Sequence, residues 1–276
     1  MLLIGGFLQI STTLLAKPVS LVEALNNGWI SVSAAAQGGH GGQSIKASFK
    51  NLHKRDLELL IPAGFIFNAS DSTFQDLIVV KERLLALEKA RSKSVMLYGM
   101  CIRASRSSPT SGLAFSAGGM ATAALAQMAQ HIDEKRLHEA PDAQHAIWAV
   151  SNGHALEGIG QPDLAAFTAK LLGKPEPTYN IRYANSARPG ERAFQDRALA
   201  VSGLFEYTNA KEISATFGLY NEQGERVLTF FEHELRKAGQ HRFRFNFQVQ
   251  NLPKGQYFAR LSDAQGLMLG EKAIRF

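Results

Sequence analysis

The chain has 276 residues, a length typical of about two domains or three small ones. Apolar residues make up 45% of it and charged residues 20%, a balance that supports a sizeable core and excludes a disordered chain. The net charge is +6, but basic and acidic residues alternate instead of forming a block, which argues against a nucleic-acid partner. The single cysteine, Cys101, excludes an intramolecular disulfide and a zinc knuckle.

The N-terminal segment reads as an export signal. Residues Leu2 to Ala16 are uncharged and mostly apolar, and they end in a small residue, as in the hydrophobic region of a signal peptide cleaved after Ala16. At about fifteen residues the segment is too short to span a bilayer, and no other run is long and apolar enough to do so. The alternative is a buried N-terminal strand or helix. We therefore expect a secreted, periplasmic or cell-surface protein with no integral membrane span.

Residues 25–107 are mostly strand-like. Ile45, Ala47 and Phe49 alternate with Lys and Ser, which gives a strand one buried and one wet face. The motif Pro62-Ala-Gly64 marks a turn between two apolar runs. Residues 81–91 contain strong helix formers, yet we favour two strands and a turn over one helix there. This region is expected to be a β-sandwich domain.

The character of the chain changes at a polar loop that spans residues 103–119, and residues 108–174 are expected to form a small helical domain. Apolar residues from Ala121 to Ile132 recur at helical spacing and predict a helix of about five turns. A second helix is expected to begin at Pro141 and to stop at Gly153. A third is expected over 162–172, with a glycine as its C-terminal cap.

Strand-like runs return after the Pro-rich linker at 174–177. Residues 180–276 hold runs separated by Gly-ended turns at 221–224 and 263–266, and residues 242–247 alternate strictly between Phe and polar residues. An Ig-like β-sandwich is expected. The predicted fold class is therefore α+β multidomain, with an N-terminal β-sandwich, a small helical middle domain and a C-terminal Ig-like β-sandwich. The expected strands are 199–207, 213–220, 226–231, 241–249, 257–261 and 268–276.

The last third resembles a known class of C-terminal module. The quoted segments are Leu219-Tyr-Asn-Glu-Gln-Gly-Glu-Arg-Val227, Gly239-Gln-His241, Leu252-Pro-Lys-Gly-Gln-Tyr-Phe-Ala-Arg-Leu261 and Glu271-Lys-Ala-Ile274. They resemble the Ig-like modules of secreted bacterial proteins, which include type IX secretion sorting domains and the hook-capping fold. The resemblance implies a contact with secretion machinery or a structural spacer. If the module is a sorting tag, it is expected to be cleaved.

A second resemblance involves Cys101 and Ala143-Gln-His-Ala-Ile-Trp148. A cysteine that closes a β-domain, followed by a helical "Q-x-A-I-W" segment, is similar to bacterial thioester domains. The resemblance implies that Cys101 and Gln144 condense into an internal thioester, an acyl group that an amine on another surface can attack. The alternatives are a buried, inert Cys101 and an ordinary helical Gln144 beside a core Trp148.

Another catalytic interpretation requires a histidine beside Cys101. A cysteine hydrolase or transferase needs an imidazole beside the thiol, and the helical region offers His131, His138, His145 and His154. A metal site is not expected, because Pro141 separates the histidines onto different helix faces. The glycine-rich segment 37–43 lacks the Lys-Ser/Thr of a P-loop, so we expect a strand connection there.

A polar binding loop is the remaining candidate site. Residues 103–111 are rich in hydroxyl groups and arginine, and the residues that could hold an anion or a sugar are Arg103, Arg106, Ser107 and Ser108. No strong catalytic motif is present, and no cofactor is implied. The sequence therefore favours a non-enzymatic binding or adhesion protein whose partner is a surface ligand or a host or cell-surface macromolecule. A Cys101-dependent enzyme and a purely structural envelope protein are the alternatives.

Overall fold

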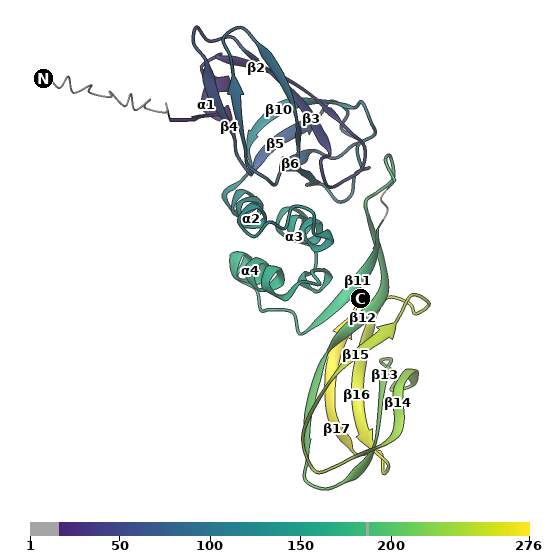
Figure 1. Cartoon of the computed structure of the whole chain (residues 1–276). Helices are drawn as coiled ribbons and strands as arrows, with labels where there is room; N and C mark the ends of the chain where they lie inside the picture. Colours follow the sequence, from purple (N-terminus) through teal and green to yellow (C-terminus); the bar gives the residue numbers. More distant parts are fainter. Residues whose placement is uncertain (1–16, 186–187) are drawn as a thin grey trace, which may run out of the picture.

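The computed structural model describes residues 17–185 and 188–276. The chain forms a β-rich molecule in which a β region, a helical region and a second β region follow one another (Figure 1). The expected signal segment Leu2 to Ala16 lies outside the described residues. Within the described ranges, no helix has the length and apolar character needed to cross a membrane.

The N-terminal region contains two sheets. The larger has seven strands in the order β8-β3-β2-β10-β5-β6-β9, and the smaller has three in the order β1-β4-β7. A short helix, α1 (Leu21–Asn26), follows β1 and is capped by the Ser20 side chain. The strands are β1 (Val19–Ser20), β2 (Ile30–Ala36), β3 (Ile45–Asn51), β4 (Leu57–Ile61), β5 (Phe65–Ala69), β6 (Leu77–Val79), β7 (Arg83–Leu87), β8 (Ser92–Leu97), β9 (Gly99–Cys101) and β10 (Ala114–Met120).

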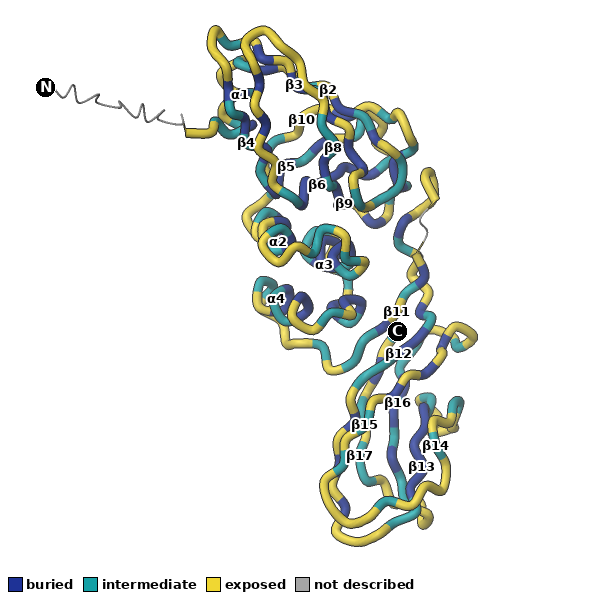
Figure 2. Tube along the Cα trace, in the orientation of Figure 1, coloured by how far each residue is buried: buried dark blue, intermediate teal, exposed yellow. Residues whose placement is uncertain are grey.

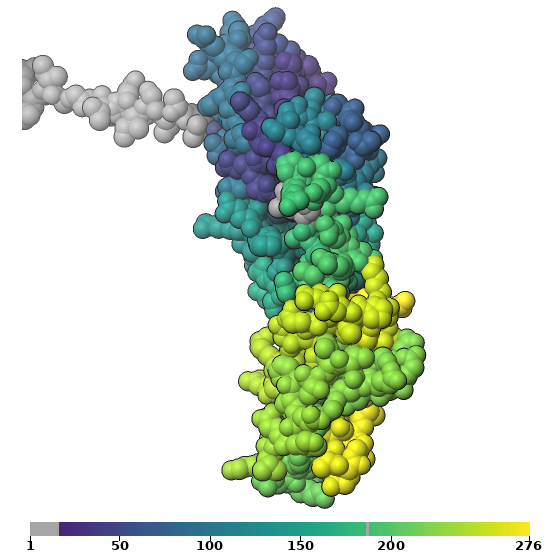
Figure 3. Space-filling view, turned by 90° about the vertical axis from the view of Figure 1, so that its right-hand side faces the viewer, coloured from purple at the N-terminus to yellow at the C-terminus, as the bar shows by residue number. Residues whose placement is uncertain are grey.

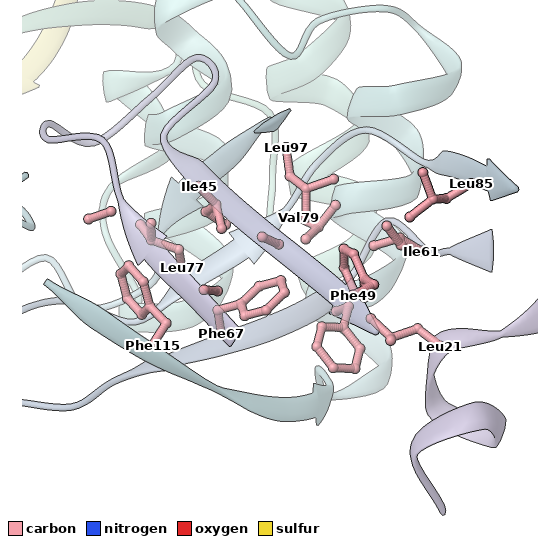
Figure 4. Close-up of a cluster of buried hydrophobic side chains, with 14 of the residues drawn as sticks. Leu21, Ile45, Phe49, Ile61, Phe67, Leu77, Val79, Leu85, Leu97 and Phe115 are labelled. Atoms are coloured by element: carbon pink, nitrogen blue, oxygen red, sulfur yellow. The ribbon is translucent and has the colours of Figure 1, made fainter. Parts of the chain in front are cut away.

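One apolar core joins the two N-terminal sheets (Figures 2 and 4). Alternating residues of β3 point into it, as the sequence predicted, and Ile45 and Phe49 are fully buried. Ile61 of the smaller sheet and Phe67 of the larger one contribute to the same cluster. The regular alternation of the sequence is thus the pattern of a sheet with one face against this core.

Residues 81–91 form no helix, as expected, but they contain one strand, β7, and the turn before β8 instead of two strands and a turn. The sheet, however, extends beyond residue 107, where the sequence analysis placed its end. Strand β10 pairs with both β2 and β5 in the middle of the large sheet. The strand was predicted as a loop because Gly118 and Gly119 are typical of loops. The pairing of β10 with β5 shifts register between Ala117 and Gly119.

The helical region covers the other face of β6 and β9. Helices α3 (Pro141–Asn152) and α4 (Pro162–Leu172) have the expected bounds, and each ends at a glycine in the left-handed conformation. The first helix, α2 (Ala123–Glu134), is shorter than expected, because Arg136 adopts a positive φ of 57° and turns the chain. A 3-10 turn, η1 (Leu156–Gly158), joins α3 to α4.

The C-terminal region has a three-stranded sheet, β11-β12-β15, and a four-stranded sheet, β14-β13-β16-β17. Both contribute to one aromatic core that includes Phe205, Phe217 and Phe245. All six predicted runs correspond to strands, and two of them, 241–249 and 268–276, were predicted to end one residue too late, whereas β11 was not predicted. The strands are β11 (Tyr179–Asn185), β12 (Phe194–Asn209), β13 (Ile213–Tyr220), β14 (Arg226–Arg236), β15 (Gly239–Gln248), β16 (Gln256–Asp263) and β17 (Met268–Arg275).

The β11–β12 hairpin extends from the C-terminal region onto the N-terminal one. In Figure 3, green atoms of this hairpin lie against the blue and purple N-terminal atoms. Ser108 accepts a backbone hydrogen bond from Gly190 at 2.9 Å and donates one to Glu191 at 2.8 Å. Ala193 is fully buried in the N-terminal core. The two β regions are therefore joined by packing as well as by the chain.

Candidate functional site

The structure brings Cys101 and Gln144 together. Cys101 ends β9, the edge strand of the seven-stranded sheet, and Gln144 lies in the first turn of α3. The Cys101 backbone N–H donates to Gln144 Oε1 at 2.9 Å, and Gln144 Nε2 donates to the Cys101 carbonyl at 2.8 Å. The carboxamide thus makes the two hydrogen bonds that a neighbouring strand would make at this edge. The backbone N–H and the backbone carbonyl of Cys101 are both satisfied.

The thiol of Cys101 lies in an apolar environment. The residue is fully buried, and it belongs to the same cluster as Trp148 of α3 and Ala193 of the hairpin. Burial, and after it the charge of Asp76, raises the pKa of the thiol well above its ordinary value. The protonated thiol is therefore the dominant form, which is the opposite of the activated thiolate that a cysteine hydrolase uses.

A small cavity of about 120 Å³ adjoins Gln144. The glycine-rich β2–β3 connection forms one wall with His40, α3 forms another with His145 and Trp148, and Asn185 of β11 closes a third side. Gln144 is only 6% exposed, so its carboxamide lies at the base of this cavity. The three regions of the chain all contribute to the site.

The four candidate histidines of the helical region do not form one cluster. The ring of His131 stacks on Phe167 at a centroid distance of 3.6 Å. His138 Nε2 lies 3.1 Å from the Lys81 ammonium, which can only donate. His145 and His154 flank Trp148, with ring centroids 5.5 and 5.9 Å from it. In the described ranges, no hydrogen bond links a histidine to the thiol of Cys101, and no set of three or more ligands could hold a metal ion.

Imidazoles near Gln144 are held neutral by their surroundings. Burial lowers the pKa of His40, and it also lowers the pKa of His145 against the opposing effect of Asp142. His40 Nδ1 and Trp148 Nε1 are buried and have no hydrogen-bond partner among the described residues. Both imidazoles are therefore neutral, and His40 Nδ1 and Trp148 Nε1 carry unused hydrogen-bonding capacity, while Glu139 adds an acidic side chain to the lining.

The residues of the predicted binding loop make contacts within the molecule. Arg103 Nε binds the Asp76 carboxylate at 2.6 Å, and Arg106 lies 4.0 Å from the same carboxylate. Ser107 forms isolated bridges to Phe74 and to Arg192 of the hairpin, and Ser108 is fully buried. Ser107 and Ser108 are thus part of the surface on which the β11–β12 hairpin docks, whereas the two arginines pair with Asp76.

Two residues of the cavity were not foreseen in the sequence. His40 was not predicted as a site residue, because segment 37–43 was interpreted as a strand connection. No local sequence pattern indicates that it lies near α3. Asn185 was missed with the whole of β11, although Tyr179, Ile181 and Tyr183 alternate with polar residues. That alternation is the signal that could have found the strand.

The comparisons with known proteins leave the family open. No model of a known protein family matches this chain, and a search of curated proteins gives no match either. The site is therefore interpreted from its own geometry.

Proposed function

We propose that the protein is an exported binding or adhesion protein of the cell envelope or exterior, which attaches covalently through an internal thioester between Cys101 and Gln144. The observation that carries the proposal is the pair of hydrogen bonds between the Gln144 carboxamide and the Cys101 backbone. These bonds hold the carboxamide against the residue that carries the thiol, so the encounter of the two side chains is intramolecular.

The condensation needs no outside reagent and no free thiolate. The Cys101 thiol passes its proton to the Gln144 nitrogen as Sγ attacks Cδ, an S–C bond forms, the C–N bond breaks, and ammonia leaves. The Cys101 N–H that donates to Gln144 Oε1 stabilises the negative charge that develops on this oxygen during the attack. Because the site is buried, water has little access to the thioester that results.

The acceptor reaction takes place at the cavity beside Gln144. A primary amine attacks the thioester carbonyl, an amide bond to the Gln144 side chain forms, and the Cys101 thiol is released. A neutral imidazole, His145 or His40, is available to take the proton that the amine loses. The partner is then a cell-surface or host macromolecule with an accessible amine.

The architecture supports a surface protein. We interpret the two C-terminal sheets around one core as an Ig-like sandwich, and the two N-terminal sheets as a second sandwich. The C-terminal module contributes Ala193 and Asn185 to the N-terminal core and to the cavity. We therefore propose that it is a permanent part of the molecule, and that any contact with secretion machinery occurs without its removal.

One observation favours a purely structural protein instead. The Gln144 carboxamide already satisfies both Cys101 backbone groups, so it could serve only to anchor α3 to the edge of the sheet. Methylamine labelling separates the two functions. The thioester predicts incorporation of one methylamine at Gln144, located by peptide mass spectrometry, and none in Cys101→Ala. Met100→Leu, a substitution on the neighbouring residue that keeps the thiol, is expected to label normally. A structural Gln144 predicts no labelling in any of these proteins.

A further inference from the structure

A second cavity shares His145 with the cavity beside Gln144. It has a volume of about 230 Å³ and is lined by residues of α3, of the α3–α4 connection and of the hairpin strands β11 and β12. These residues are His145, His154, Ala155, Tyr183, Phe194 and Asp196. Its volume is below the roughly 300–1,000 Å³ of pockets for drug-sized ligands, so it suits a single side chain or head group.

Aromatic rings form most of its wall. The ring centroid of Phe194 lies 4.3 Å from that of His154, 5.3 Å from that of Tyr183 and 6.1 Å from that of His145. The ring planes are inclined to one another by 51°, 60° and 79° respectively, so the rings face the space from several directions. An enclosure of ring faces attracts a cation, because each face carries the negative end of the ring quadrupole.

In the described part of the chain, the only acidic side chain in the lining of this cavity is Asp196. The Asp196 carboxylate lies in its wall and is paired with Lys254. Burial, followed by the negative charges of Asp196 and Glu157, raises the pKa of the Tyr183 phenol to about 12. Burial also lowers the pKa of His154 and His145, so that these imidazoles are uncharged at neutral pH. Among the described residues, no cationic side chain lines this cavity, and the nearest positive charge is the Lys254 ammonium that pairs with Asp196 at its edge.

We propose that this cavity, enclosed by Phe194, Tyr183 and the two imidazoles with Asp196 at its rim, binds an alkylammonium group. The ring faces supply the cation–π attraction, and the carboxylate supplies the complementary charge. A neutral ligand of the same shape would gain only the apolar contact. An anion would be repelled by the Asp196 carboxylate and by the negative faces of the rings.

The proposal is independent of the thioester. It needs neither Cys101 nor Gln144, and it concerns a cavity that is separate from the one beside Gln144. The two cavities share His145 in their linings, so a bound cation would lie next to the first cavity. Binding of the cation and formation of the thioester can therefore each fail without the other.

Trp148 provides a direct readout. Its ring lies 5.7 Å from Phe194 and 5.5 Å from His145, whereas the other tryptophan, Trp29, stacks near His53 in the N-terminal region. In a Trp29→Phe background, titration with tetramethylammonium chloride at constant ionic strength is expected to change Trp148 emission in a saturable way. Uncharged tert-butanol is the matched control and is expected to give no saturable change. Nα-acetyl-lysine amide tests whether a primary ammonium also enters.

Variants test the ring and charge contributions separately. Phe194→Leu keeps an apolar side chain but removes the ring face, and it is expected to weaken tetramethylammonium binding about tenfold. Tyr183→Phe keeps the ring and is expected to bind as the parent does. Lys254→Gln frees the Asp196 carboxylate and is expected to tighten binding. Phe230→Leu, a matched change at an exposed ring of β14, is expected to have no effect.

The outcomes that overturn the proposal are specific. Equal responses to tetramethylammonium and tert-butanol would show an apolar pocket with no preference for a cation. Unchanged affinity in a folded Phe194→Leu variant would show that the rings do not bind the ligand. Since Phe194 packs against the N-terminal core, this variant could fail to fold. In that case weaker or unchanged binding in Lys254→Gln contradicts the proposal by itself.

Discussion

Gln144 makes both of its amide hydrogen bonds to a single residue, Cys101, which lies 43 positions earlier in the chain. This contact joins the edge of the N-terminal sheet to the first turn of α3 at the base of a cavity to which all three regions contribute. Whether the pair is reactive or structural, it fixes the position of the helical region on the sheet. The contact therefore has consequences for stability as well as for chemistry.

Removal of the Gln144 side chain is expected to destabilise the protein. Gln144→Ala leaves a buried N–H and a buried carbonyl of Cys101 without partners, each at a cost of about 1–3 kcal/mol. Urea denaturation should show a loss of at least about 2 kcal/mol. Gln127→Ala on the exposed face of α2 is the control and is expected to change stability by less than about 0.5 kcal/mol. Equal stability of the two variants would mean that the hydrogen bonds between Gln144 and Cys101 do not stabilise the fold.

Acid should weaken the junction between α3 and the hairpin. Burial lowers the pKa of His40, His145 and His154 below the ordinary value of 6.5. The unfolded chain then binds more protons than the folded one, so this contribution to stability is complete above about pH 6.5 and is lost as the pH falls below it. The free energy of unfolding, measured by urea titration between about pH 7.5 and 5, should decrease.

His145→Gln tests the origin of this acid sensitivity, because it removes one of the buried titrating groups and leaves the others in place. The decrease between neutral and acidic pH should be smaller in this variant than in the parent. An identical pH profile for the two proteins would exclude His145 as a source of the effect.

Much of the architecture could be predicted from local patterns, because the elements concerned are specified locally. Pro162 and Gly173 bound a helix whose limits were predicted correctly, and the turn at 221–224 closes with a backbone hydrogen bond from Gly224 to Asn221. The central strand β10 was missed, because its glycines carry a turn signal that pairing with β2 and β5 overrides.

The site was only partly accessible from the sequence. Cys101 and Gln144 were named, and the structure brings them into contact. Of the residues expected in a binding loop, Arg103 pairs with Asp76 and Ser108 is buried at the contact with the hairpin. The docking of that hairpin is a long-range contact between residues about 80 positions apart, and no periodicity in a single sequence encodes it.

The hairpin contact predicts a specific sensitivity at Ala193. A larger side chain at this fully buried position overpacks the N-terminal core, so Ala193→Leu should cost about 1–3 kcal/mol and shift Trp148 emission. Ala210→Leu, at an exposed position of the same region, is the control and should leave both unchanged within about 0.5 kcal/mol. Tolerance of Ala193→Leu would indicate that the hairpin is not held against the N-terminal core in solution.

A reaction between Cys101 and Gln144 changes the mass of the protein, so the intact mass of the freshly purified protein reveals it. We expect a mass lower by one ammonia than the sequence requires, with the full calculated mass restored in Cys101→Ala and in Gln144→Ala. A full mass in the parent protein, unchanged by either substitution apart from the side chains themselves, would contradict the thioester and leave Gln144 as an anchor of α3.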